Sequence, residues 1–553
     1  MAIQTVRRQW TGVVERVLRP IDLLKQLIAR LSGWLNQERW TNLLTLLALM
    51  LGNLVILYFF LQGQDNRAIA FVVLALIAPL AFLLPELSIV AFICAGAGLF
   101  VNIMYYAAGP GGGTGERTLI LAFLAILTVR AIYEYLRTPR TQRPRLFSWF
   151  TVILLLFWGY YMIHVAIIYL FHYDAPSTDP IAATFGIEER GIFRYFDYHM
   201  IWIGVLPMII LLRDYQRAKR VFILLAIIAI LNILAIALDY LIQIPDFFKI
   251  MFQLRAAGVT EEGYRIRDPA SLYLLLIGFF SAVYALGYAR GWSNIVLIVF
   301  LAMALFAILI TKNRALWIGM MVFAPIALFW KPPQVLFRQA WLLAASFLAL
   351  LTVMMNPSIA NMTRQVISEA AERWSRNYAF GGDPRLDPSY QARVREFEAF
   401  SFHWARLTPI EKLFGMGLEA RYGHYVSLAD LGYQGPRFQR LYFEKVYMHF
   451  SWVARLHQLG YIGVSLLALT LLGFLVRAAA VFLRTPNAVA RMLLIGVAGS
   501  TVSLISFDVL HQALRSNTVI PVIMLWSLAE IIPHWQRSGQ LPSAEMQDAP
   551  VEV

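Results

Sequence analysis

Long apolar runs separated by short polar connections make up most of the chain. A helix that crosses a bilayer needs about 20 apolar residues, and runs of this kind recur from residue 41 to residue 533. They predict about fourteen spans, at residues 41–62, 68–84, 87–108, 118–136, 147–171, 198–212, 221–242, 270–289, 293–311, 315–330, 340–355, 456–478, 491–507 and 519–533. The pattern predicts an all-α polytopic membrane protein, with spans 1 to 11 in residues 41–355 and spans 12 to 14 in residues 456–535.

Polar segments flank these spans at both ends. Residues 1–40 form a basic amphipathic segment that Pro20 divides in two, and we expect it to lie on the inner leaflet, with partner binding as the alternative. Residues 536–553 form a polar tail, expected to be disordered.

The connections between spans differ in charge and so predict the topology. Arginine and lysine are dense in residues 137–145, 213–220, 331–338 and 484–491, which we therefore place in the cytoplasm. The connections at residues 173–190, 246–268 and 356–455 are then placed on the external side of the membrane. An even number of spans puts both termini in the cytoplasm.

Composition supports the membrane interpretation and limits the chemistry. The chain is 59% hydrophobic and 14% charged, so lipid must be the solvent for most of its side chains. Its formal net charge of +14 is interpreted as topology and affinity for anionic lipid rather than nucleic-acid binding. The single cysteine, Cys94, excludes an internal disulfide and a cysteine-based metal site. The glycine-rich stretch 110–116 lacks the Gly-Lys-Ser/Thr ending of a phosphate loop and is expected to be an external turn.

The longest connection, residues 356–455, is expected to be a mostly helical external loop that carries the function. Residues 389–407 predict an amphipathic helix with Phe397, Phe400 and Trp404 at helical spacing. Aromatic rings beside arginines suit two kinds of ligand: sugars stack on flat rings, and phosphates take bidentate contacts from arginine. The simpler alternative is a folded cap whose aromatics only pack on the membrane face.

Three short stretches carry candidate chemistry. "TKNRALWIGMMV" (311–322) places Arg314 where one span ends outside and the next begins. "LFGMGLEARYGHY" (413–425) contains the Gly415-Met416-Gly417 turn, and "VYMHFSWVARLHQLGYIGVSL" (446–466) begins beside His449. Each has a plainer explanation by itself: an arginine that reaches lipid headgroups, an ordinary loop, and a structural histidine.

In order and spacing these stretches resemble the O-antigen ligase/polymerase superfamily, which comprises O-antigen ligases and Wzy-type polysaccharide polymerases. In that family a histidine after the large periplasmic loop is followed by glycines eleven and fourteen positions later, as His449 is by Gly460 and Gly463. Asn313-Arg314-Ala315-Leu316-Trp317 is similar to the family's Ser-Arg helix start. The resemblance covers roughly residues 290–480.

The resemblance implies a set of site residues. His449 would be the general base, and Arg314 and Arg393 would bind a diphosphate, with Arg395 as the alternative second arginine. Residues expected to contact substrate are Arg395, Gly415, Gly417, Arg421, His424 and Trp452. His403 and His457 lie nearby. Asp508, His511 and Arg515 are expected to form a structural polar cluster, with a contribution to diphosphate binding as the alternative.

The resemblance also implies a function. The protein would be a metal-independent, inverting glycosyltransferase of the bacterial inner membrane, without a cofactor. Its donor would be an undecaprenyl-diphosphate-linked glycan, its acceptor a glycan or lipid-linked sugar hydroxyl, and a chain-length regulator a further partner, with no nucleic acid. Arginines suit the diphosphate because their charge is permanent, and histidine suits the hydroxyl because it titrates near neutral pH.

Other functions stay open at this point. A polymerase is preferred over an O-antigen ligase that attaches glycan to the lipid A core. A lipid-linked oligosaccharide flippase would also have many spans. A glycosyltransferase whose base is an acidic residue of the first external loop would have to use Asp65.

Overall fold

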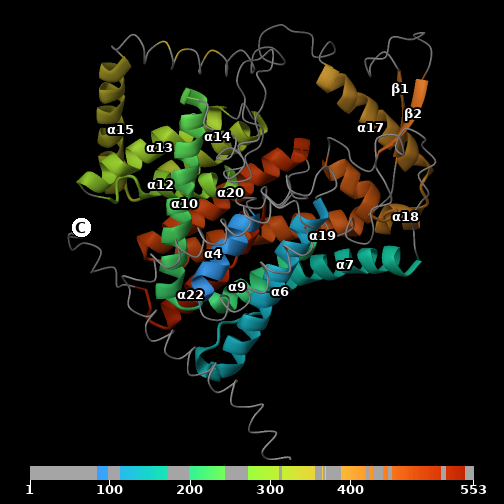
Figure 1. Ribbon diagram of the computed structural model, residues 1–553, viewed down its shortest axis with the longest axis horizontal. Helices are drawn as coiled ribbons and strands as arrows, with labels where there is room; N and C mark the ends of the chain where they lie inside the picture. Colours follow the sequence, from blue (N-terminus) through green and yellow to red (C-terminus); the bar gives the residue numbers. More distant parts are fainter. Residues whose placement is uncertain are drawn as a thin grey trace, which may run out of the picture.

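The computed structural model describes residues 84–96, 113–171, 198–242, 272–289, 291–310, 314–354, 388–418, 422–427, 440–445, 451–511 and 519–541, with residues 361, 364 and 368. Regular structure in these parts is mostly helical (Figure 1). The α-helices are α4 (Pro85–Gly96), α6 (Gly113–Arg137), α7 (Trp149–Phe171), α9 (Val205–Leu211), α10 (Tyr215–Ile242), α12 (Leu272–Ala285), α13 (Trp292–Ile310), α14 (Arg314–Phe329), α15 (Pro333–Met354), α17 (Pro388–Arg406), α18 (Pro409–Phe414), α19 (Ser451–Arg484), α20 (Ala488–His511), α21 (Ile520–Leu525) and α22 (Leu528–Arg537). The remaining elements are the 3-10 helices η2 (Arg140–Gln142) and η4 (Tyr198–Gly204) and the strands β1 (Tyr422–Ser427) and β2 (Arg440–Lys445).

Five of the described helices are long and apolar enough to cross a membrane. They cover Trp149–Ile167, Tyr215–Asp239, Trp292–Ile310, Ser451–Arg484 and Ala488–Asp508. Shorter apolar helices in the described residues cover Pro85–Cys94, Ile201–Leu211, Leu272–Ala285 and Leu316–Phe329. By length and composition, this is a multi-pass helical membrane protein.

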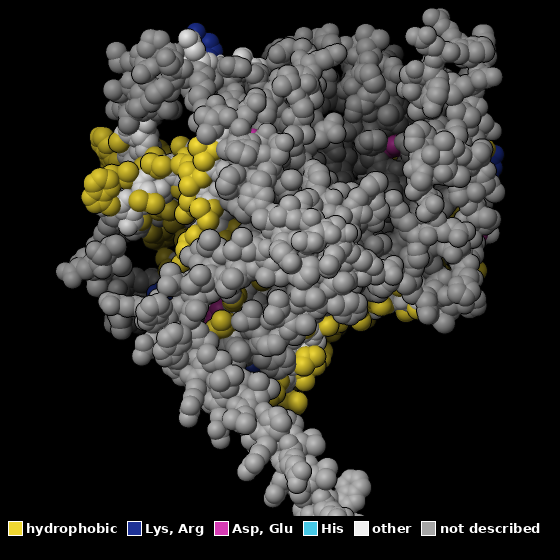
Figure 2. All heavy atoms as spheres, in the orientation of Figure 1, with side chains coloured by type: hydrophobic (Ala, Val, Ile, Leu, Met, Phe, Trp, Pro, Cys, Tyr) yellow, Lys and Arg dark blue, Asp and Glu magenta, His cyan; other side chains and the backbone are white. Residues whose placement is uncertain are grey.

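The outer surface of these helices is apolar as well. Along α13, α14 and α15, the side chains of Trp292, Val296, Phe329, Phe337 and Trp341 are 62–79% exposed. Figure 2 shows hydrophobic side chains gathered on the left of the molecule, where these helices lie in Figure 1. Rings this exposed to water would be costly, so they indicate a surface in contact with lipid.

The centre of the fold is α20, which packs against α12, α14 and α19. Its contacts with α14 pair early residues of one helix with late residues of the other. A Cβ on Gly319 would lie 2.5 Å from the Cα of Ser503, and a Cβ on Gly499 would lie 2.7 Å from the ring of Phe323. The two helices are therefore antiparallel, and the start of α14 lies at the same end as the last turns of α20.

A second antiparallel pair is formed by α7 and α19. Phe150, near the start of α7, faces Phe474 in the second half of α19 at 5.9 Å between ring centroids. Farther along α7, the ring of Tyr160 lies beside Gly463. Phe474 also stacks on Trp526, which follows α21, at 4.9 Å, and Trp526 is fully buried. These rings join α7, α19 and α21 into one core with α20.

Helices α17 and α18 and the β1–β2 hairpin gather at one end of the molecule, on the right of Figure 1. We call this the loop end, and the end that carries α22 the opposite end. The hairpin is antiparallel, with Tyr425 opposite Tyr442. The strands at 422–427 and 440–445 were not predicted: residues 356–455 were expected to be mostly helical, and α17 and α18 agree with that expectation.

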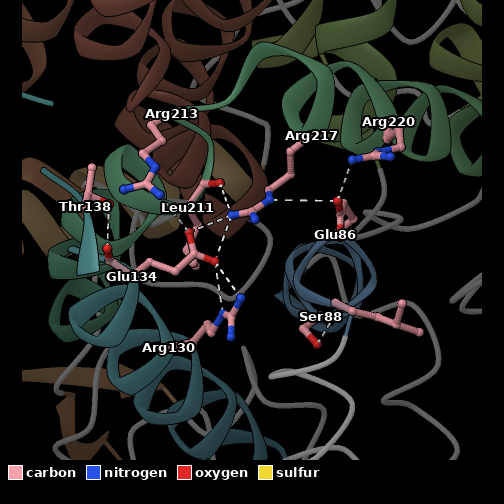
Figure 3. Close-up of polar contacts among 10 residues, drawn as sticks. Glu86, Ser88, Arg130, Glu134, Thr138, Leu211, Arg213, Arg217 and Arg220 are labelled. Atoms are coloured by element: carbon pink, nitrogen blue, oxygen red, sulfur yellow. Dashed lines mark hydrogen bonds and ion pairs between the residues drawn. The ribbon is translucent and has the colours of Figure 1, made fainter. Parts of the chain in front are cut away.

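Charged side chains join α4, α6 and α10 in the network of Figure 3. The carboxylate of Glu134 accepts hydrogen bonds from Arg217 Nη1 at 2.8 Å and from Arg130 Nε at 3.0 Å. Arg220 Nη2 lies 3.0 Å from Glu86 Oε1, and Arg213 Nη2 lies 4.0 Å from Glu134 Oε2. Four arginines thus surround two carboxylates. The ends of α6 and α10 that carry the basic connections therefore lie side by side.

Two predicted spans are interrupted in the structure. Residues 198–212 form η4 followed by α9, and residues 519–533 form α21 and α22 with a turn at Trp526 and Ser527 between them. At this turn Trp526 Nε1 donates to Thr501 Oγ1 at 3.0 Å, and Ser527 Oγ donates to Met524 O at 2.8 Å. The backbone stays right-handed through this turn, because Trp526 and Ser527 keep αR angles and their N–H groups donate to Ile523 O and Met524 O.

Helix edges also differ from the prediction. The glycine-rich stretch 110–116 was expected to be a turn, but its described part opens α6 at Gly113. The apolar run that follows extends the helix over these glycines. Helix α19 begins at Ser451 and ends at Arg484, whereas the pattern predicted 456–478. The predicted spans 41–62 and 68–84 lie outside the described residues, except for Leu84 itself.

Candidate functional site

The loop joins the membrane helices at a break in α19. Gly460 has φ 65° and ψ −173°, which are not helical angles. Such a break deprives the carbonyls one turn before it of their usual N–H partners. The Gly415–Gly417 turn supplies replacements: Met416 N–H donates to His457 O, and Gly417 N–H donates to Gln458 O, both at 2.9 Å. The two glycine motifs selected in the sequence therefore meet.

This contact requires glycine on both sides. Gly415 has φ 82°, and a Cβ there would lie 2.5 Å from the backbone nitrogen of Gly460. A Cβ on Gly460 would lie 2.6 Å from the carbonyl carbon of Leu413. Both positions combine a left-handed φ with backbone at contact distance, so a side chain would be strained and would also push the segments apart.

Tyr160 of α7 completes the joint, and sequence reasoning missed it. Its hydroxyl lies 2.8 Å from Phe414 O and 2.8 Å from Leu459 O. Gly463 leaves room for its ring, because a Cβ there would lie 2.7 Å from Tyr160 Cε1. The signal available in the sequence was a polar pattern within an apolar span, with Tyr160, Tyr161 and His164 within about one turn.

Hydrogen bonds cap helix α18 at both of its ends. Thr408 and Glu411 form a capping box: Thr408 N–H donates to Glu411 Oε2 at 2.7 Å, and Glu411 N–H donates to Thr408 Oγ1 at 3.3 Å. The carboxylate of Glu411 accepts from both the N–H and the hydroxyl of Thr408, and these two hydrogen bonds lower the pKa of Glu411. The helix ends at Gly415, whose N–H donates to Glu411 O at 2.7 Å. The cap fixes the turn that meets Gly460.

Aromatic side chains seat α17 on the beginning of α19. The ring of Phe400 stacks on Trp404 at 5.3 Å and lies edge-on to His457 at 6.4 Å, and Trp404 meets Tyr461 at 5.4 Å. Phe400 is buried, as is His457. The predicted amphipathic helix 389–407 is confirmed as α17. These aromatics pack, as the simpler interpretation of the loop expected, whereas Phe397 is 50% exposed.

An ion pair lies buried where α19 begins. Arg455 Nη2 donates to Asp508 Oδ1 at 2.9 Å, Arg455 Nη1 donates to Asp508 Oδ2, and Ser451 Oγ donates to Asp508 Oδ2 at 3.1 Å. Arg455 is 1% exposed and Asp508 0%. The sequence had grouped Asp508 with His511 and Arg515. Arg515 lies outside the described residues, and Arg455 is a partner that the sequence did not indicate.

The predicted catalytic residues have the following places. Arg314 is the first residue of α14, and Arg393 and Arg395 lie in α17. His424 lies in β1 opposite Phe443, and Trp452 is the second residue of α19, half-buried, with its ring 5.9 Å from the Arg455 guanidinium. His449 and Arg421 lie outside the described residues, and His449 precedes Ser451 by two positions.

Helix packing brings the starts of α14 and α19, which carry or adjoin predicted site residues, towards the end of α20. Asp508, near the end of α20, binds Ser451 and Arg455 from the first turns of α19. Since α14 and α20 are antiparallel with Gly319 opposite Ser503, the start of α14 at Arg314 points to the end of α20 that holds Asp508. The starts of α14 and α19 therefore both lie near the end of α20, and α17 and α18 pack on α19.

Comparisons with models of protein families, with curated proteins and with solved structures find no match to this chain.

Proposed function

We propose that the chain is a glycosyltransferase of the bacterial inner membrane that uses a polyprenyl-diphosphate-linked donor. It transfers a glycan from undecaprenyl diphosphate to an acceptor sugar hydroxyl on the periplasmic side, as a polymerase of O-antigen or exopolysaccharide. In this proposal about fourteen spans cross the membrane, both termini lie in the cytoplasm, and residues 356–455 form the catalytic loop.

One observation carries the proposal: three segments chosen for their motifs approach the same end of the fold. The Gly415–Gly417 turn binds the backbone of α19. The start of α14 at Arg314 points to the end of α20 that binds Ser451, two residues after His449. This arrangement supports the proposal of one reaction centre at the edge of the membrane helices, where a lipid-borne diphosphate would meet a water-borne hydroxyl.

The chemistry follows from the residue types. Arg314 and Arg393, or Arg395 in its place, bind the diphosphate and stabilise the charge that develops on the departing oxygen. His449 accepts the proton of the acceptor hydroxyl as its oxygen attacks the anomeric carbon. The bond between that carbon and the diphosphate oxygen breaks, undecaprenyl diphosphate leaves, and the anomeric centre inverts.

The test is turnover by the purified full-length protein in nanodiscs supplied with an undecaprenyl-diphosphate-linked glycan. Free undecaprenyl diphosphate and product length are measured together. The His449→Ala variant is expected to lose about 10²–10⁴-fold in turnover with an unchanged thermal unfolding curve. His403→Ala is the matched control for His449→Ala. Arg406→Ala is the matched control for Arg393→Ala, since both arginines lie in α17, as His403 does.

The outcomes separate the candidate functions. Products that lengthen by repeats support the polymerase, and a single transfer to lipid A core makes the protein a ligase. Movement of the donor across the bilayer without release of undecaprenyl diphosphate would instead identify a flippase. Full turnover by His449→Ala would contradict the proposed general base.

A further inference from the structure

A cavity of about 370 Å³ opens at the opposite end of the molecule, between the start of α7, the last turns of α19 and α22. Four arginines line it: Arg145, Arg477, Arg484 and Arg537. Among the described residues that line it, the one carboxylate is that of Glu530, which is 5% exposed. The proposed reaction uses none of these residues, and the cavity lies at the end away from α17 and α18.

The carboxylate is already neutralised. Arg477 Nε lies 2.9 Å from Glu530 Oε1, and Arg477 Nη2 lies 2.9 Å from Oε2, a fork-to-fork pair. Ser148 Oγ adds a third donor at 2.7 Å from Oε1. Glu530 therefore has little capacity left to balance the other arginines of the cavity.

The other three arginines leave an excess of positive charge. Within the described residues, Arg145, Arg484 and Arg537 have no carboxylate within ion-pair distance, and Arg537 Nε instead donates to Pro533 O at 3.1 Å. All three side chains are exposed at the mouth of the cavity. With Arg477 and Glu530 cancelling, the cavity presents a charge of about +3, which suits a phosphate group carried by another molecule.

The surroundings of the cavity are apolar. Phe147 and Trp149, which both line it, are 72% and 47% exposed, and Leu483 beside Arg484 is 60% exposed. Exposed rings next to arginines are typical of the interface between headgroups and acyl chains. A free phosphate would use the arginines alone, whereas a phospholipid would use the arginines and the rings.

We propose that this cavity binds the headgroup of an anionic phospholipid, with the acyl chains against Phe147 and Trp149. Basic pockets between membrane helices on the cytoplasmic side bind such headgroups. The predicted topology puts residues 137–145 and 484–491 on that side. The inference does not depend on the proposed glycosyl transfer, because it uses only the cavity and its charge.

The experiment is native mass spectrometry of the full-length protein purified in detergent and mixed with phosphatidylglycerol or phosphatidylcholine. Wild type is expected to retain phosphatidylglycerol in preference. The double variant Arg145→Gln/Arg484→Gln is expected to lose about 10- to 30-fold in that affinity. Arg140→Gln is the matched control, since Arg140 is exposed in η2 next to the same connection but does not line the cavity.

Each outcome decides the proposal. Equal retention of the two lipids, or unchanged retention by the double variant, overturns it. Full displacement of phosphatidylglycerol by millimolar inorganic phosphate also overturns it, because the site would then recognise a free anion. Thermal unfolding of the double variant without anionic lipid should match that of wild type, which shows that the exposed arginines can be replaced without loss of the fold.

Discussion

The backbone of Gly415 in the loop lies directly against the backbone of Gly460, in the first third of the membrane helix α19. Neither residue leaves room for a Cβ on the other, and both have a left-handed φ. Three successive carbonyls before the break, those of His457, Gln458 and Leu459, accept hydrogen bonds from Met416, Gly417 and Tyr160. The break is therefore the place where the loop is attached to the membrane helices.

The first prediction separates this attachment from ordinary backbone strain. Ala at either glycine of the turn costs about 1–2 kcal/mol for its left-handed φ. Only Gly415→Ala adds steric overlap, because a Cβ on Gly417 has nothing within 4 Å. Gly415→Ala should therefore unfold at a lower temperature than Gly417→Ala and expose α18 to limited proteolysis. Equal unfolding temperatures would show that the close approach does not matter.

The second prediction concerns the hydroxyl of Tyr160. Tyr160→Phe keeps the ring beside Gly463 but leaves the carbonyls of Phe414 and Leu459 without this donor. The expected loss is about 1–3 kcal/mol in the free energy of unfolding, measured by thermal unfolding in detergent. Tyr461→Phe is the control, since Tyr461 is 50% exposed and its ring only packs on Trp404. A stability loss that is the same in both variants would contradict the bridging role.

The third prediction tests the buried ion pair. Asp508→Asn would leave the guanidinium of Arg455, 1% exposed, without its carboxylate. Removal of one partner of a buried pair costs on the order of 3–5 kcal/mol, whereas replacement of both by apolar residues is often neutral. The double variant Arg455→Met/Asp508→Leu should thus unfold at a higher temperature than Asp508→Asn alone. The reverse order would mean that the pair itself stabilises the fold.

The fourth prediction is a pH dependence at Lys331, in the connection between α14 and α15. Its Nζ donates to Val283 O and Leu286 O, each at 2.9 Å, and to Gln339 Oε1. Burial lowers its pKa from 10.5 to about 7, although three oxygen acceptors match the three hydrogens of the ammonium form. The ring centroid of Tyr284 lies 5.5 Å from Lys331 Nζ. Lys331 and Arg491 line one cavity together.

The sign follows from proton binding. Between pH 7 and 10.5 the unfolded chain keeps a proton on Lys331 that the folded chain has released. Stability of the folded state should therefore rise with pH across this window. Thermal unfolding of wild type at pH 7, 8 and 9 should show the rise, and Lys331→Met should flatten it. An unchanged slope in the variant would assign the pH dependence to another group.

Local pattern predicted the elements well where a helix has one regular apolar surface, in the bilayer or on the membrane face. The span predicted at 293–311 is Trp292–Ile310, and the amphipathic helix predicted at 389–407 is Pro388–Arg406. A run of apolar residues satisfies its backbone only as a helix in lipid, so composition alone is enough. Spacing also identified Gly460, because its interval from His449 resembles that of a known motif.

Local pattern was insufficient where a polar group depends on a distant partner. Residues 519–533 contain enough apolar residues for one span, but the hydrogen bond of Trp526 to Thr501 stabilises a turn within them. The hairpin of residues 422–427 and 440–445 was missed because a strand is stable only beside another strand.

The amino-acid sequence by itself determined that this chain folds as helices in a membrane, and it marked the glycines at which a turn and a helix approach each other. The tertiary structure alone decided that Gly415 meets Gly460, that Tyr160 joins them, and that Arg455 pairs with Asp508. The reason is physical: transfer into lipid acts on each residue where it stands, whereas a hydrogen bond or ion pair exists only when packing brings both partners together.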